Sequence, residues 1–395
     1  MVMITREDIR ELAQLQCIED EGGSAISFYF QPRTPQNKSH REEAILLKDL
    51  VRDTIRDAEK DGKNVSLRRD LQRIVELAGQ LHGNQARAKA VFACGNRRFW
   101  REFDLPPQLS GTQLFVNRRF HLKPLAALLG AHPRICVVLL DRHKARVFDL
   151  RLDEVKEQEG LFRPLPHRGR GDGFAGYDGG HAERSVQDEA LHHFKFVAEH
   201  LREALEKDLF DNLIIGCQES NWHDLETHLH PYLKKRMLGR FSADVGSMKA
   251  DHVREQAGRI LRESRDERRR NLVKEVISQS KSNSRGVTGL RRVLRSLELG
   301  EVQTLLMGEN YRAHAVECTG CGHLDAHMVR YCPACGRSTR ELEDVCEAII
   351  PATIRRDIEL FYVDGDPEFD KVGNIAALLR FRADQSKGSG MAAVS

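Results

Sequence analysis

Residues 135–150 read Ile-Cys-Val-Val-Leu-Leu-Asp-Arg-His-Lys-Ala-Arg-Val-Phe-Asp-Leu, and this stretch decides the fold of the middle of the chain. The apolar run 135–140 is typical of a strand buried on both faces, and 145–150 is predicted as its hairpin partner. A helical pattern follows from 186 to 205, and residues 213–217 predict a further strand. This alternation of strands and helices favours an α/β layer.

Toward the N-terminus, residues 1–130 are predicted to form one mixed α/β domain. Bulky apolar runs predict strands at 24–30, 90–94, 99–103 and 113–116, and helical patterns cover 42–59 and 67–81. No motif in this part indicates a function.

Toward the C-terminus, residues 251–281 are predicted as one long helix with an apolar stripe at each end. Its middle, 262–271, has no apolar side chain, as a connector between two cores requires, so the boundary between a middle domain (131–264) and a last domain (265–384) is placed there. Helices are expected in the last domain at 290–299 and 342–348, strands at 302–307, 358–363 and 375–381, and a disordered tail at 385–395. The predicted fold class is α/β and α+β in three domains.

The amino-acid composition excludes several classes of protein. The 395 residues include 62 Lys and Arg against 59 Asp and Glu, and the net charge of +3 excludes a protein that coats nucleic acid non-specifically. Hydrophobic residues make up 40%, which excludes wholesale disorder. No stretch approaches the ~18 apolar residues of a membrane span, and residues 1–10 are too charged for a signal peptide. No membrane association and a cytoplasmic location are therefore expected.

Four of the nine cysteines form two Cys-x-x-Cys pairs separated by ten residues, namely Cys318, Cys321, Cys332 and Cys335. Each pair is followed by a glycine, which permits the tight turn that brings two thiolates to one ion. This spacing predicts a zinc ribbon at 318–335 in the last domain, and four thiolates leave no position for water, so the zinc is expected to be structural. His323 and His327 are alternative ligands, and the other five cysteines are expected to be buried thiols.

A loop with six glycines in twelve residues, 169–180, precedes the helical pattern of the middle domain. It lacks the Gly-Lys-Ser or Gly-Lys-Thr ending of a nucleotide-binding P-loop. Arginines beside glycines suit contact with RNA phosphates, whereas the alternative is a solvated surface loop. His181 follows the loop, and it is either a functional residue or an ordinary surface histidine. A second metal site with Asp172, Asp178 and His181 is disfavoured because their loop carries no fixed ligand spacing.

Taken in order, these parts resemble the archaeal and eukaryotic class-one release factor and Pelota superfamily, particularly its bacterial members. The resemblance is carried by Arg168-Gly-Arg-Gly171 and Gly179-Gly-His181 before a helix from about Glu183, and by the closing strand Gly373-Asn-Ile-Ala-Ala-Leu-Leu-Arg-Phe381. The four-cysteine insertion of the last domain is similar to that of archaeal members. One departure is clear, because His181 stands where the family has the glutamine of its Gly-Gly-Gln release motif.

The resemblance implies a ribosome-associated factor that occupies the A site in rescue or hibernation. In this interpretation Arg163, Arg168, Arg170 and Arg184 contact rRNA or tRNA phosphates, and Gly179, Gly180 and His181 form the tip. The implied partners are the ribosome, including a P-site tRNA, and a translational GTPase. Two alternatives remain open: a ribosome-dependent peptidyl-tRNA hydrolase in which His181 positions water, and a zinc-containing scaffold outside translation.

Overall fold

This computed structural model describes residues 4, 6–15, 24–31, 41–60, 65–80, 88–105, 111–126, 133–151, 154–158 and 179–383. The chain divides into two compact units, one made of Met1–Gly130 with Asn271–Ser395 and the other of Ala131–Arg270. No helix in the described ranges is long and apolar enough to cross a bilayer.

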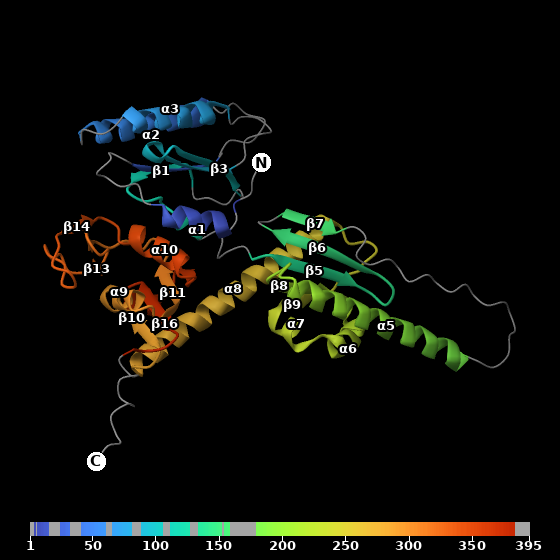
Figure 1. Cartoon of the computed structure of the whole chain (residues 1–395). Helices are drawn as coiled ribbons and strands as arrows, with labels where there is room; N and C mark the ends of the chain where they lie inside the picture. Colours follow the sequence, from blue (N-terminus) through green and yellow to red (C-terminus); the bar gives the residue numbers. More distant parts are fainter. Residues whose placement is uncertain are drawn as a thin grey trace, which may run out of the picture. The chain divides into compact units, whose positions relative to one another are not determined.

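The N-terminal part of the first unit is an antiparallel sheet in the order β3-β2-β1-β4, with helices on both faces (Figure 1). Its strands are β1 (Ala25–Phe30), β2 (Ala88–Cys94), β3 (Phe99–Leu105) and β4 (Gln113–Asn117), and its helices are α1 (Arg6–Gln14), α2 (Arg41–Lys60) and α3 (Val65–Gln80), with a short 3-10 turn, η3 (Gly95–Arg97). In β1, Ile26 and Phe28 pack toward α2 and α3, whereas Tyr29 packs in the cluster that contains α1. The predicted strands and helices of this part are confirmed.

The second unit is a five-stranded sheet in the order β7-β6-β5-β8-β9. Its strands are β5 (Ile135–Leu140), β6 (Ala145–Arg151), β7 (Glu154–Gln158), β8 (Asn212–Gly216) and β9 (Met237–Phe241), and its helices on one face are α5 (Gly179–Glu206), α6 (Glu219–His228) and α7 (Pro231–Arg236). The hairpin β5–β6 is antiparallel and β8 runs parallel to β5. Val138 packs toward α5 and Val137 toward the opposite face, which is why the whole of 135–140 is apolar.

A single 32-residue helix, α8 (Ala250–Lys281), runs from the second unit into the first, as the sequence predicts. Val253 and Ala257 belong to the core of the second unit, whereas Val273 and Val276 belong to a core of the first. The two units separate at 270/271, within the stretch 262–271 that has no apolar side chain.

The C-terminal part of the first unit is a sheet in the order β10-β16-β11-β15, beside a small sheet in the order β13-β12-β14. The strands are β10 (Gly286–Thr288), β11 (Val302–Gly308), β12 (Ala315–Cys318), β13 (Leu324–Asp325), β14 (Thr339–Leu342), β15 (Glu359–Val363) and β16 (Ile375–Leu379), and the helices are α9 (Leu290–Glu298), α10 (Cys346–Arg355) and α11 (Pro367–Lys371). The helix predicted at 342–348 is observed as α10, but its predicted start is wrong because α10 begins at Cys346. Leu342 pairs with Ala315 in the small sheet, and the N–H of Cys346 bonds Asp344 Oδ1 at 3.0 Å where α10 begins.

The N-terminal and C-terminal parts of the first unit share one hydrophobic core. Ile9 and Leu12 of α1 lie in the same cluster as Met307 of β11 and Ile350 of α10. The sequence analysis predicts residues 1–130 and 265–384 as separate domains, whereas their contacts join most of these residues in one compact unit. The division into three domains stays a prediction.

Candidate functional site

Two tight turns present the four cysteines. In the first, the N–H of Gly322 donates to the carbonyl oxygen of Cys318 at 3.2 Å, and in the second, the N–H of Gly336 donates to that of Cys332 at 2.9 Å. Gly322 and Gly336 both have φ of 72°, in the left-handed region that glycine adopts without steric cost. The glycine after each pair is therefore required by the turn.

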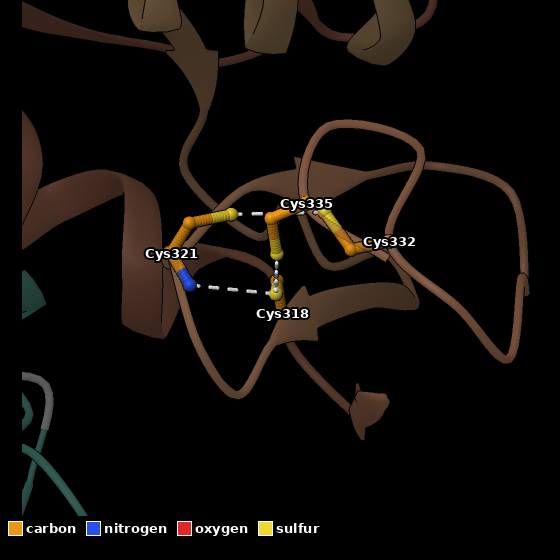
Figure 2. Close-up of side chains that lie close together, drawn as sticks. All are labelled: Cys318, Cys321, Cys332 and Cys335. Carbon is orange, nitrogen blue, oxygen red and sulfur yellow. Dashed lines mark hydrogen bonds between the residues drawn. The ribbon is translucent and has the colours of Figure 1, made fainter. Parts of the chain in front are cut away.

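The four sulfur atoms lie around one point (Figure 2). The Sγ atoms of Cys318 and Cys335 are 3.3 Å apart, those of Cys321 and Cys332 are 3.6 Å apart, and all four lie within 4.8 Å of one another. An ion bound tetrahedrally at ~2.3 Å from each thiolate sets neighbouring sulfur atoms about 3.8 Å apart. The arrangement can hold one tetrahedral ion, and four thiolates leave no position for a water ligand.

Backbone N–H groups point at two of the four sulfur atoms. Cys318 Sγ accepts from the N–H of Gly320 at 3.3 Å and of Cys321 at 3.4 Å, and Cys332 Sγ accepts from the N–H of Ala334 at 3.4 Å. These hydrogen bonds, first that from Cys321, lower the pKa of the Cys318 thiol below its usual range. A metal ligand needs this deprotonated form.

The two nearby histidines have other partners. His323 Nδ1 lies 2.8 Å from Glu298 Oε1, and His327 Nδ1 lies 3.0 Å from Asp325 Oδ1. Within the described ranges, the group that could hold a metal ion consists of the four cysteines alone. The alternative of a histidine ligand is therefore not supported.

The remaining cysteines are mostly buried thiols, as the sequence predicts. Cys136, Cys217 and Cys346 are buried and free, and burial raises the pKa of Cys136 to about 12, so this thiol stays protonated. Cys94 differs, because it is buried but bonded in a disulfide. The expectation of a buried thiol is wrong at that position.

The residues of the predicted tip lie at the start of a long helix. Because α5 begins at Gly179, residues Gly179, Gly180 and His181 form its first turn, whereas the sequence places them in the loop 168–181 and begins the helix near Glu183. Arg184 lies one turn further along α5, and the structure describes only the backbone of His181 and Arg184. Arg163, Arg168 and Arg170, with the rest of the glycine-rich loop, lie outside the described residues.

The sequence interpretation missed a further group of exposed residues on α5 and α7. Phe196 is 50% exposed and Tyr232 is 64% exposed, which is unusual for aromatic side chains. The available signal was the run Tyr232-Leu-Lys-Lys-Arg236, in which an aromatic residue is followed by three cations.

Comparison with known proteins identifies relatives of the chain. Residues 121–262 match the model of the bacterial archaeo-eukaryotic release factor family 10. The peptide chain release factor subunit 1 of Thermococcus sibiricus is 26% identical over 308 residues, covering 70% of this chain and 74% of the relative. The corresponding protein of Archaeoglobus fulgidus is 28% identical over 294 residues, covering 68% and 70%.

Solved structures were compared as well. A structure of ribosome-bound archaeal Pelota covers 97% of this chain and 96% of its own, with 14% identity and a TM-score of 0.41. The chain is therefore similar to archaeo-eukaryotic release factors, through the family match over residues 121–262 and through archaeal relatives that are 26% and 28% identical.

Proposed function

We propose that this translation factor, of the release factor and Pelota type, binds the ribosomal A site in ribosome rescue or hibernation. The observation that carries the proposal is the similarity to archaeal peptide chain release factors over 70% of the chain. Ribosomes, with the rRNA and the P-site tRNA, are its partners in the cytoplasm, and delivery by a translational GTPase belongs to the same proposal.

The start of α5 is the part that enters the ribosome. Gly179, Gly180 and His181 occupy the first turn, where backbone N–H groups have no acceptor within the helix and can donate to RNA or to a peptidyl ester. Glycine is about 1 kcal/mol less favourable than alanine in a helix, so this turn opens at low cost. Arg163, Arg168, Arg170 and Arg184 supply phosphate contacts around it.

The ribbon at 318–335 holds a structural zinc in this proposal. The convergent sulfur atoms of Cys318, Cys321, Cys332 and Cys335 and the N–H groups directed at them support it. The zinc would fix two loops that have few apolar contacts of their own, and it has no open position for catalysis.

Competition on the ribosome tests the proposal. The protein should co-sediment with ribosomes that carry P-site peptidyl-tRNA and an empty A site, and aminoacyl-tRNA in the A site should displace it. Binding should weaken with rising salt because phosphate contacts are screened. Binding that A-site tRNA leaves unchanged would contradict the proposal.

Peptide release from the same complexes separates binding from hydrolysis. A binding factor releases no peptide, and Gly180→Ala should weaken its ribosome binding, because the added methyl group obstructs close approach of the backbone to RNA. Release by the wild type that is lost in His181→Ala would instead favour the peptidyl-tRNA hydrolase.

A further inference from the structure

One face of the second unit combines exposed rings with cations that form no ion pair with a carboxylate of the described residues. Phe196 and His200 lie one turn apart on α5 with ring centroids separated by 4.3 Å, and His230 and Tyr232 lie at the start of α7 with centroids separated by 4.9 Å. Helices α5 and α7 pack together through buried residues such as Val197 and Leu233 (Figure 1). We call the exposed residues of these two helices the α5–α7 face.

Glu199 connects the two pairs of rings. Its pKa is lowered first by the hydrogen bond from Arg202, and the charges of His230 and His200 lower it further, so both imidazoles lie near this carboxylate. The N–H of Tyr232 donates to His230 Nδ1 at 3.3 Å, which fixes that imidazole at the start of α7. The two pairs of rings therefore lie on two helices that pack against each other.

Lys234, Lys235 and Arg236 form the last turn of α7 and are exposed. Among the ion pairs between described residues, none includes these three cations, whereas Arg202 on α5 pairs with Glu199 and Glu206. The positive charge of the face is thus concentrated on α7, one turn from the exposed ring of Tyr232.

We propose that the α5–α7 face binds single-stranded RNA, with bases stacked on Phe196 and Tyr232 and phosphates bound by the cations of α7. Exposed rings bind any base through its π-face, and Lys and Arg follow the backbone, which is the chemistry of single-strand recognition. An acidic peptide would use the cations but would gain little from flat rings. The inference goes beyond A-site binding, because it uses neither the glycine-rich loop nor the start of α5.

Binding of a fluorescein-labelled, mixed-sequence 12-nucleotide RNA by the full-length protein tests the inference. Phe196→Ala and Tyr232→Ala should each weaken binding about tenfold at constant salt. Lys234→Gln combined with Lys235→Gln should reduce the slope of log affinity against log salt by about 1.4. The controls are Leu209→Ala, an exposed apolar residue outside the face, and Arg254→Gln combined with Arg259→Gln, two exposed cations of α8.

Three results would overturn the inference: equal losses in the control variants, equal affinity for a 12-base-pair duplex, or displacement of the RNA by polyglutamate at equal charge. The last result would indicate an acidic protein partner. Ribosome co-sedimentation of the same variants separates this inference from the proposed function. RNA binding that persists in a protein with no affinity for ribosomes would contradict only the A-site proposal.

Discussion

Arg119 and Glu317 stand 198 residues apart in the sequence and form a two-pronged ion pair inside the first unit. Arg119 Nη1 donates to Glu317 Oε2 at 3.2 Å, and its Nη2 donates to Oε1. Arg340 of β14 donates its Nε–H to the same carboxylate at 3.1 Å. Because Glu317 is only 3% exposed and precedes Cys318, this cluster anchors the ribbon to the N-terminal part of the unit.

Replacing Arg119 by methionine should lower the free energy of unfolding by about 2–3 kcal/mol. Breaking a buried ion pair costs about 3–5 kcal/mol because a buried charge is left without a partner. The loss is smaller here because Arg340 still pairs with the Glu317 carboxylate. Urea unfolding of the full chain measures the change. Arg10→Met is the matched control: Arg10 pairs with Asp357 at 2.7 Å on the surface, and its loss should cost less than about 1 kcal/mol. Equal losses in the two variants would contradict the role of the buried cluster.

Glu347→Gln should stabilise the protein at alkaline pH. Glu347 Oε1 accepts a hydrogen bond from Asn117 Nδ2 at 2.6 Å, while burial, and then Asp344, raise its pKa to about 7. A carboxyl whose pKa is higher in the folded state than in the unfolded state loses stability as pH rises from about 4.5 to 7. Glutamine keeps the acceptor without the charge.

Unfolding free energies at pH 8 and pH 4.5 check this prediction. The variant should gain about 1–2 kcal/mol at pH 8, a range discounted for the partial exposure of Glu347, and it should match the wild type at pH 4.5. Glu341→Gln, on the exposed part of β14, is the control and should change stability by less than about 0.5 kcal/mol. A pH-independent gain would exclude the buried charge as its cause.

His121→Phe should remove a loss of stability at acidic pH. The ring of His121 stacks on Phe115 with centroids 3.8 Å apart, and burial, followed by the charge of Lys123, lowers its pKa to about 4. Below about pH 6.5 the unfolded state takes up a proton on this histidine, whereas the folded state does so only near pH 4. The free energy of unfolding therefore falls as the pH drops from about 6.5 toward 4. Phenylalanine keeps the stacking and cannot take up a proton.

Urea unfolding at intervals from pH 7.5 to 4.5 measures the difference between the two proteins. Below about pH 6.5 the wild type should lose up to about 1.4 kcal/mol per pH unit relative to the variant. His252→Phe, at an exposed position on α8, should leave the pH profile unchanged. Parallel profiles for wild type and His121→Phe would show that the pKa of His121 is the same in the folded and unfolded states, and would contradict the prediction.

Cys321→Ser should abolish zinc binding. The wild type is expected to carry one zinc per chain by elemental analysis, and the variant far less, because serine is a poor ligand in a four-thiolate site. A chelator should lower the melting temperature of the wild type but not of the variant. Cys217→Ser replaces a buried free thiol of the other unit and should retain the metal. A full zinc content in Cys321→Ser would refute the site.

Local sequence patterns were sufficient to predict those helices, strands and turns whose structure depends on their own residues. The run 135–140 is apolar at every position, so it reads as a strand with two covered faces in any context. The two apolar stripes of 251–281 and the polar stretch between them likewise predict one helix with ends in different cores, as observed in α8. The spacing of the four cysteines with the glycine behind each pair predicts the cluster, because the turns are local.

Local patterns failed where a distant partner decides the structure. The sequence predicts Leu342 as the start of a helix at 342–348, but its pairing with Ala315 places it in a strand. The short helical run that the sequence suggests up to Leu238 ends earlier, because the chain leaves α7 after Arg236 and pairs with β8 from Met237. Hydrogen-bond partners across a sheet are not encoded in a short window of sequence.

The sequence by itself determined the α/β character, the long connecting helix and the cysteine cluster, since each follows from periodicity or from spacing over at most a few turns. The tertiary structure alone decided that Arg119 pairs with Glu317 and that α5 and α7 pack against each other. Such contacts depend on the register and packing of segments far apart in the chain, and they cannot be predicted from composition. The fold class was therefore predictable from the sequence, and the surfaces available to partners were not.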